Sequence, residues 1–334
     1  LMHIVITGGA GFIGSHLAAA LLDQGHTLTL IDDLSTGRRE NVAPILGDRC
    51  DLRVMRVGDL DDAGDWLDGV DQVYHLAAAV GVKLIVDEPV ACIENNVLET
   101  ARLLRATARR GVATLIASSS EVYGKSTRVP FRETDDVTYG ATVYSRWSYA
   151  MAKALDEQLA LAHHGADGLP VVIVRLFNTV GPRQVGQYGM VIPRFLENAL
   201  ANQPIEIYGD GRQTRCFCHV SDVAAALVRL MAEPTCVGGV YNLGGDQEVT
   251  IADLAARVIA LTGSTAGVRH VPYDQAYQTR FDDLRRRVPD LTRVREAIGF
   301  RPTWTLDQML EQLAEQARRD RLTARTTNAV TGAD

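Results

Sequence analysis

The chain has 334 residues, and its hydrophobic (46%) and charged (22%) fractions are those of a globular protein with room for a large core. A formal charge of −7 argues against nucleic-acid binding, and no apolar run has the roughly 18 residues of a membrane-spanning helix. The five cysteines are scattered, and Cys216-Phe217-Cys218-His219 lacks the spacing of a metal site. We therefore expect no disulfide framework, no metal, no signal peptide and a cytoplasmic location.

The N-terminal segment has the pattern of a nucleotide-binding turn. A β-branched run at residues 3–7 leads directly into a glycine-rich stretch, and apolar residues at helical spacing follow. A strand, a glycine turn and a helix N-terminus bind a dinucleotide pyrophosphate on backbone N–H groups. The residues predicted to contact the cofactor here are Gly8, Gly11, Phe12, Ile13 and Gly14.

Two acidic residues end the next apolar run, at residues 28–31. A carboxylate at the position of Asp32 accepts hydrogen bonds from the adenosine ribose hydroxyls. Asp32 and Asp33 together would repel the 2′-phosphate of NADP, so they favour NAD, although Arg38 and Arg39 lie close by in the sequence.

Further strand-like runs at residues 52–58, 71–76, 114–117 and 171–177 alternate with helical stretches. This rhythm predicts an α/β fold, a Rossmann-type doubly wound parallel sheet, with ligands beyond the carboxyl ends of the strands. The residues that follow the strands and are predicted to touch the cofactor are Asp59, Leu60, Leu76, Ala77 and Ala78.

Tyr149 and Lys153 stand four residues apart, which places them on one face of a helix. An ammonium near a phenol favours phenolate, a usable base at neutral pH. Ser119, at the predicted end of a strand, could bridge that phenol and a substrate hydroxyl. The spacing alone is weak, because tyrosine and lysine are common on helix surfaces. The glycine turn makes the catalytic interpretation strong.

The chain divides into unequal parts. Residues 1–178 carry the predicted NAD-binding domain and the catalytic residues, and later segments at about 212–245 return to it. Residues 179–322, where glycine and proline become more frequent, are expected to form a smaller, interleaved C-terminal lobe that binds the substrate. The small, polar residues 323–334 are predicted to be a disordered tail.

With these motifs, the chain resembles the extended short-chain dehydrogenase/reductase family over about residues 2–310, and more narrowly the nucleotide-sugar epimerases, dehydratases and decarboxylases. Supporting stretches include Asn95-Asn96-Val97 and residues 175–183 and 207–215. The resemblance implies NAD as cofactor, contacted also by Asn96, and a UDP-sugar substrate. Tyr149 would then be the base, with Lys153 holding the tyrosine and the nicotinamide ribose. In the substrate site it implies that Asn178, Arg215 and Arg287 contact the diphosphate and that Tyr208 and Val191 border the base. Arg183 is the sixth substrate-binding residue that it implies.

The reaction within this family is less certain from the sequence. All members would oxidise C4 to a 4-keto sugar. A 4,6-dehydratase carries an aspartic acid where this chain has Ser120, and a hydroxyl is too weak an acid for that elimination. Ser119-Ser120-Glu121 is similar to the Thr-Ser-Glu run of UDP-glucuronate decarboxylases, which form UDP-xylose or a UDP-4-keto-pentose, so Ser119, Ser120 and Glu121 are predicted to be catalytic.

Two alternatives stay open. A 4-epimerase acting on UDP-glucuronate or UDP-glucose needs no acid at residues 120 or 121. A non-catalytic, NAD-binding regulatory protein is the alternative from another class, although such proteins usually lose the tyrosine or the lysine. A homodimer is expected, because residues 89–110 and the helix of Tyr149 carry apolar residues on more than one face, which suits a four-helix interface.

Overall fold

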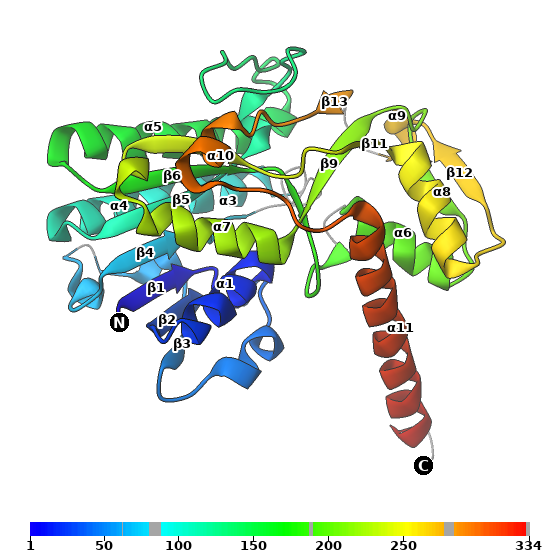
Figure 1. Cartoon of the computed structure of the whole chain (residues 1–334), viewed down its shortest axis with the longest axis horizontal. Helices are drawn as coiled ribbons and strands as arrows, with labels where there is room; N and C mark the ends of the chain where they lie inside the picture. The colour runs from blue at the N-terminus through cyan, green and yellow to red at the C-terminus, as the bar shows by residue number, and fades with distance from the viewer. Residues whose placement is uncertain (62, 80–87, 187–189, 277–283, 332–334) are drawn as a thin grey trace.

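A computed structural model of the chain describes residues 1–61, 63–79, 88–186, 190–276 and 284–331. A larger lobe is built around a parallel sheet, and a smaller lobe lies beyond the carboxyl ends of its strands (Figure 1).

The central sheet has seven strands in the order β10-β6-β5-β4-β1-β2-β3, all parallel. Its order reverses direction at β1, which confirms the predicted doubly wound fold and places a ligand crevice between β1 and β4. The predicted run at residues 52–58 is a strand only as far as Val54. The seven strands are β1 (His3–Thr7), β2 (Thr27–Asp32), β3 (Cys50–Val54), β4 (Gln72–His75), β5 (Ala113–Ser119), β6 (Val171–Leu176) and β10 (Gly239–Leu243).

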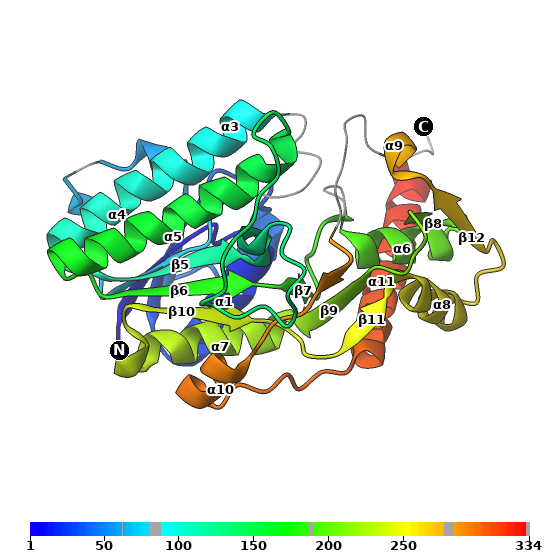
Figure 2. The same cartoon turned by 90° about the horizontal axis from the view of Figure 1, so that it is seen from above.

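Helices cover both faces of this sheet (Figure 2). On one face Leu17 and Leu21 of α1 and Leu227 of α7 pack on Ile4 and Ile6 of β1. On the other, Leu104 of α4 and Ala160 of α5 pack on Ile116 and Ile173. The apolar residues of the strands point to both faces, as expected for a buried parallel sheet. The covering helices are α1 (Phe12–Asp23), α7 (Val220–Ala232) and α10 (Thr292–Ile298) on the first face and α3 (Pro89–Ile93), α4 (Glu99–Arg110) and α5 (Ser148–Asp167) on the second.

The smaller lobe has two small sheets and its own core, which includes Ile192, Phe195, Leu254 and Leu310. The chain enters it through β7, leaves it through β9 and α7 to add β10 to the central sheet, and then returns. The segment that rejoins the large lobe is therefore 220–243, shorter than the predicted 212–245, because β9 pairs within the small lobe. Its elements are β7 (Asn178–Val180), α6 (Val191–Leu200), β8 (Ile205–Tyr208), β9 (Thr214–His219), β11 (Glu248–Thr250), α8 (Ile251–Thr262), β12 (Val268–Val271), α9 (Tyr273–Ala276), β13 (Arg286–Arg287) and α11 (Leu306–Thr331).

The final helix, α11, reaches Thr331 and so covers most of the segment 323–334, where the sequence predicted a disordered tail. No proline or glycine interrupts residues 306–331, so nothing breaks the i to i−4 hydrogen-bond ladder before Gly332. Among the described residues, no helix is both long and apolar enough to cross a bilayer.

Candidate active site

A cavity of about 940 Å³ lies beyond the carboxyl ends of the central strands and is lined by residues of both lobes. This volume is at the upper end of the range of about 300–1,000 Å³ for small-molecule sites. Most predicted site residues line it, and four, Asp59, Leu60, Asn96 and Arg183, do not. Those that do are Gly8, Gly11, Phe12, Ile13, Gly14, Asp32, Asp33, Leu76, Ala77, Ala78, Ser119, Ser120, Glu121, Tyr149, Lys153, Asn178, Val191, Tyr208, Arg215 and Arg287.

The glycine turn is shaped by close backbone contacts. Gly8 has a φ of 69°, and a Cβ there would lie 2.8 Å from the backbone nitrogen of Ala77. A Cβ on Gly14 would collide with the carbonyl oxygen of Gly8. Gly11 is the N-cap of α1, whose first N–H groups face the cavity end of the helix. The turn therefore offers a tight backbone cradle for a pyrophosphate, and it fits a dinucleotide.

Asp32 ends β2 at the rim of this cradle. Its Oδ2 accepts from the Ala10 N–H and its Oδ1 from the Leu34 N–H, both at 2.9 Å. Burial raises the pKa of this carboxyl, and the two N–H groups oppose that rise. The carboxylate is thus fixed between the glycine turn and the next loop, with lone pairs left for ribose hydroxyls.

Asp59 and Leu60 are not among the residues that line the cavity, and their contact with the cofactor stays a prediction. Because β3 ends at Val54, the chain turns earlier than expected, and Arg56 and Val57 line the cavity instead. The carboxylate of Asp59 closes a short 3-10 turn by accepting from the Arg56 N–H at 3.3 Å. Leu60 packs in the core beneath.

Asn96 is also displaced from the cavity, and Asn95 lines it. Residues Glu94–Leu98 form a π-helical segment, and the extra residue per turn rotates the side chains that follow. Asn96 is buried and clamps Ala79, accepting from its N–H at 3.0 Å and donating to its carbonyl at 3.2 Å. It therefore supports the cavity wall rather than forming it.

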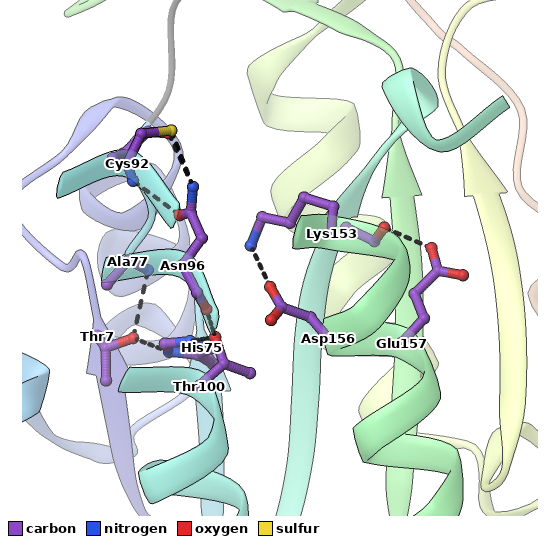
Figure 3. Close-up of polar contacts among 11 residues, drawn as sticks. Thr7, His75, Ala77, Cys92, Asn96, Thr100, Lys153, Asp156 and Glu157 are labelled. Atoms are coloured by element: carbon purple, nitrogen blue, oxygen red, sulfur yellow. Dashed lines mark hydrogen bonds and ion pairs between the residues drawn. The ribbon is translucent and has the colours of Figure 1, made fainter. Parts of the chain in front are cut away.

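A buried hydrogen-bond chain holds the wall from below (Figure 3). His75 lies with Nδ1 2.7 Å from Oγ1 of Thr7 and Nε2 2.9 Å from Oγ1 of Thr100. Thr7 also accepts from the Ala77 N–H, and Thr100 donates to the Asn96 carbonyl. These directions assign the Nε2–H tautomer. Burial lowers the pKa of His75 to about 3, so it is neutral.

Tyr149 of α5 is buried beside the strand-end serine, Ser119, as predicted. Burial raises the pKa of Tyr149 above its usual value, the charge of Glu121 raises it further, and a hydrogen bond with Ser119 opposes the rise. Burial therefore outweighs the groups that lower this pKa, and the lowering by Lys153 expected from the sequence stays a prediction. The Lys153 ammonium forms an ion pair with Asp156, with 3.2 Å between Nζ and Oδ2.

Glu121 and Arg287 form a partly buried ion pair across the cavity, with 2.8 Å between Oε1 and Nη1. Arg287 is buried while Arg285 and Arg286 are exposed, so one member of this arginine run belongs to the site. Arg287 pairs in register with Arg215 on β9, whose Nη1 donates to two backbone carbonyls. Two arginines at paired positions of neighbouring strands thus line the cavity, where a diphosphate or carboxylate could bind.

The far end of the cavity is lined by Asn178, Val191 and Tyr208. The sequence analysis missed Arg194, whose guanidinium lies 4.0 Å from the centroid of the Tyr208 ring. Its Nε and Nη1 are buried without a hydrogen-bond partner among the described residues. Arg183 has a φ of 71° in the loop after β7 and does not line the cavity.

Comparisons with known proteins agree with this site. The model of the NAD dependent epimerase/dehydratase family matches residues 4–244. The chain belongs to this family. It is 39% identical over 94% of its length to a UDP-N-acetyl-alpha-D-glucosaminuronate decarboxylase of Bacillus cytotoxicus, covering 97% of that protein. It is 36% identical over 95% of its length to UDP-glucuronic acid decarboxylase 2 of Arabidopsis thaliana, covering 68% of it.

Among solved structures, a UDP-glucuronic acid 4-epimerase from Bacillus cereus, in complex with UDP-glucuronic acid and NAD, superposes with a TM-score of 0.86 at 26% identity, covering 95% of this chain and 99% of that one. The epimerase/dehydratase family is NAD dependent, and the glycine cradle and Asp32 of this chain fit that cofactor. Gly8, Gly11, Gly14 and Asp32 would hold NAD, which accepts and returns a hydride when bound.

Proposed function

We propose that this chain is a decarboxylase of a UDP-linked uronic acid. The observation that carries the proposal is the Glu121–Arg287 ion pair, which faces the same cavity as Tyr149 and Ser119. Its two decarboxylase relatives support the same activity. UDP-glucuronate, giving UDP-xylose or a UDP-4-keto-pentose, is our first substrate, and UDP-N-acetylglucosaminuronate is the second.

The proposed chemistry begins at Tyr149. Its phenolate removes the proton from O4 of the sugar, with Ser119 bridging the two oxygens, as C4 is oxidised to a ketone. The sugar is then a β-keto acid, which releases CO2 when the bond between C5 and its carboxylate breaks and the electron pair enters an enolate. Protonation at C5 and return of the hydride and of the O4 proton complete the pentose.

Arg287 would hold the sugar carboxylate. Glu121 occupies one edge of its guanidinium, while Nε is buried without a partner among the described residues. An arginine fixed by one carboxylate can donate its remaining N–H groups to a second anion. Ser120 is buried next to this pair and, as a hydroxyl, is too weak an acid for the elimination of a dehydratase.

A product assay tests the proposal. The protein is incubated with NAD and with UDP-glucuronate, UDP-N-acetylglucosaminuronate or UDP-glucose in parallel. Release of CO2 with a UDP-pentose, or its 2-acetamido counterpart, is the expected result. UDP-galacturonate without gas would instead establish 4-epimerisation, the alternative that the structural similarity to a UDP-glucuronic acid 4-epimerase favours. No product from any of the three would contradict both.

We also propose a homodimer in the cytoplasm. Leu98, at the end of the π-helical segment, and Leu155 of α5 are 57% and 47% exposed, although both helices cover the sheet with their other faces. Val90 and Ile93 of α3 add to this apolar surface. Pairing with the same surface of a second copy would bury it as a four-helix interface. All five cysteines are free, which suits a reducing compartment.

A further inference from the structure

Asp156 lies on α5 beside Lys153 (Figure 3), seven residues after the proposed catalytic tyrosine, Tyr149. Its side chain is fully buried, and its Oδ2 is 3.2 Å from Nζ of Lys153, itself 2% exposed. Its Oδ1 is also buried, and a side-chain hydrogen bond from Thr100 helps to keep the carboxylate charged. A buried carboxylate depends on such partners, because burying an unpaired charge is costly.

Three side chains form one stripe on this helix. Tyr149, Lys153 and Asp156 stand at positions i, i+4 and i+7, which share a face. The ammonium of Lys153 therefore lies along the helix between a phenol and a carboxylate. The ion pair with Asp156 partly compensates its positive charge, and the negative charge of Asp156 is itself one of the causes that raise the pKa of the phenol, after burial and Glu121.

The other titratable and polar groups around this stripe are either uncharged or have their charge paired with a partner outside the stripe. From β4, His75 is neutral, and from α3, burial raises the pKa of the Cys92 thiol. After β5, Glu121 pairs with Arg287. On α5 itself, Glu157 accepts hydrogen bonds from Arg175 and Ser118. From α4 and the π-helical segment, Thr100 and Asn96 contribute uncharged groups.

We propose that Asp156 is a positioning residue that holds and neutralises the Lys153 ammonium and thereby sets the pH range in which Tyr149 acts as the base. The inference rests on the proposed function only for the role of Tyr149. Burial raises the pKa of Asp156 to about 6, and Lys153 opposes the rise, so the carboxylate is charged at neutral pH. At lower pH its protonation would release the full charge of the ammonium toward the phenol.

The test compares Asp156→Asn with the parent protein by two readouts. The first is the acid limb of kcat/KM against pH with the substrate that the product assay identifies. The second is the titration of Tyr149 in the NAD-loaded protein by 13Cζ-tyrosine NMR, with the signal assigned from Tyr149→Phe. Asp156→Asn removes a negative charge about two helical turns from Tyr149. The midpoint of the acid limb and the midpoint of the Tyr149 titration should therefore each move about one pH unit lower.

Matched variants separate this role from others. Asp167→Asn removes the same charge from the exposed end of α5 and should leave both midpoints unchanged, as should Asp156→Glu, which keeps the charge. An unchanged or higher midpoint in Asp156→Asn, or in Asp156→Ala if the first variant does not fold, would overturn the proposal. So would a loss of folding in both charge-free variants while Asp156→Glu folds. If the NMR midpoint moves but no UDP-sugar reacts, the proposed function fails and this inference stands.

Discussion

Nη1 of Arg287 lies 2.8 Å from Oε1 of Glu121, and this pair joins the two lobes across the cavity. Arg287 comes from β13 of the small lobe, whereas Glu121 lies two residues after the end of β5 in the large one. The pair thus links the side of the site that carries Tyr149 to the side that carries Arg215. Both residues line the cavity that Tyr149 also lines.

If the pair acts as a unit, its two residues should not contribute independently. We expect Glu121→Gln and Arg287→Lys each to lower decarboxylation by about 100-fold, and the double variant to be no worse than the poorer single one. Rates of CO2 release give the comparison. Arg286→Lys is the control, because Arg286 is exposed and pairs with Glu248, so its activity should stay within about twofold of the parent. Additive losses would show that the residues act separately.

Tyr149→Phe removes the proposed base and leaves the ring in place. Turnover of every UDP-sugar should fall by about 10³-fold or more, since general-base catalysis contributes roughly 10²–10⁴. Binding of NAD should persist, because the glycine cradle and Asp32 are untouched. Product formation and NAD titration by fluorescence measure the two effects. Retention of more than a tenth of the activity would assign the base to another group.

Gly14→Ala should abolish NAD binding or destabilise the fold, because the new Cβ would collide with the carbonyl oxygen of Gly8. A matched control is Gly165→Ala near the end of α5, where a Cβ would meet nothing within 4 Å. That variant should bind NAD normally and gain about 0.4–1 kcal/mol, since alanine restricts the unfolded chain and favours helix. Isothermal titration measures NAD binding by the two variants, and thermal melting measures their stability. If Gly14→Ala bound NAD and melted like Gly165→Ala, the close backbone packing of the glycine turn would be contradicted.

His75 should make the fold sensitive to acid. Its pKa is lowered by burial to about 3 in the folded state, against about 6.5 when unfolded, so its stabilising contribution is complete above pH 6.5 and is lost as the pH falls toward 3. The loss amounts to about 1.4 kcal/mol for each pH unit. Urea unfolding at pH 7.5 and 5.0 should therefore show the parent losing about 2 kcal/mol relative to His75→Gln. Asp156 titrates in both proteins and cancels in this difference. If the difference in unfolding free energy between the two proteins were the same at both pH values, His75 would not be buried in its neutral form.

Charge on the exposed helix surface should break the proposed dimer. Leu98→Arg and Leu155→Arg each place a guanidinium in the expected interface, and burying it without a partner is strongly unfavourable. Light scattering after gel filtration should show a parent of about twice the monomer mass and variants shifted to monomer. Val237→Arg, 42% exposed just before β10, is a control that should leave the mass unchanged. A monomeric parent would refute the interface.

Much of this arrangement could be predicted from the sequence because it depends on local rules. The run at residues 3–7, the glycine turn and Asp32 form one continuous strand-turn-helix pattern, and they are found where that pattern places them. The four-residue spacing of Tyr149 and Lys153 likewise puts both at the cavity. The relative positions of residues within one helix, or within one strand-turn-helix unit, follow from the local backbone geometry, so they can be predicted from sequence spacing.

Other features of the site have physical causes that such patterns do not contain. Because β3 ends early, Arg56 and Val57 line the cavity and Asp59 and Leu60 do not, and in the π-helical segment Asn95 lines it and Asn96 does not. Arg194 lies on α6 of the small lobe, where only the tertiary structure brings it to Tyr208. Asp156 did carry a signal, an acid three residues after the lysine on the same face, but its burial beneath α4 could not be inferred from spacing alone.

The way the chain crosses between its lobes limits how this enzyme can diversify. β7 pairs with β9, and β9 continues directly into α7 and then into the edge strand of the central sheet. A fragment ending after β6 would lack β10, so the edge of β6 would be unpaired, and it would lack α7, which packs against α1 and β1. An unpaired strand edge of this kind promotes aggregation. Recombination with a relative after β6 would therefore exchange α7 and the edge strand β10 together with the small lobe, so the two lobes would have to remain compatible across the central sheet.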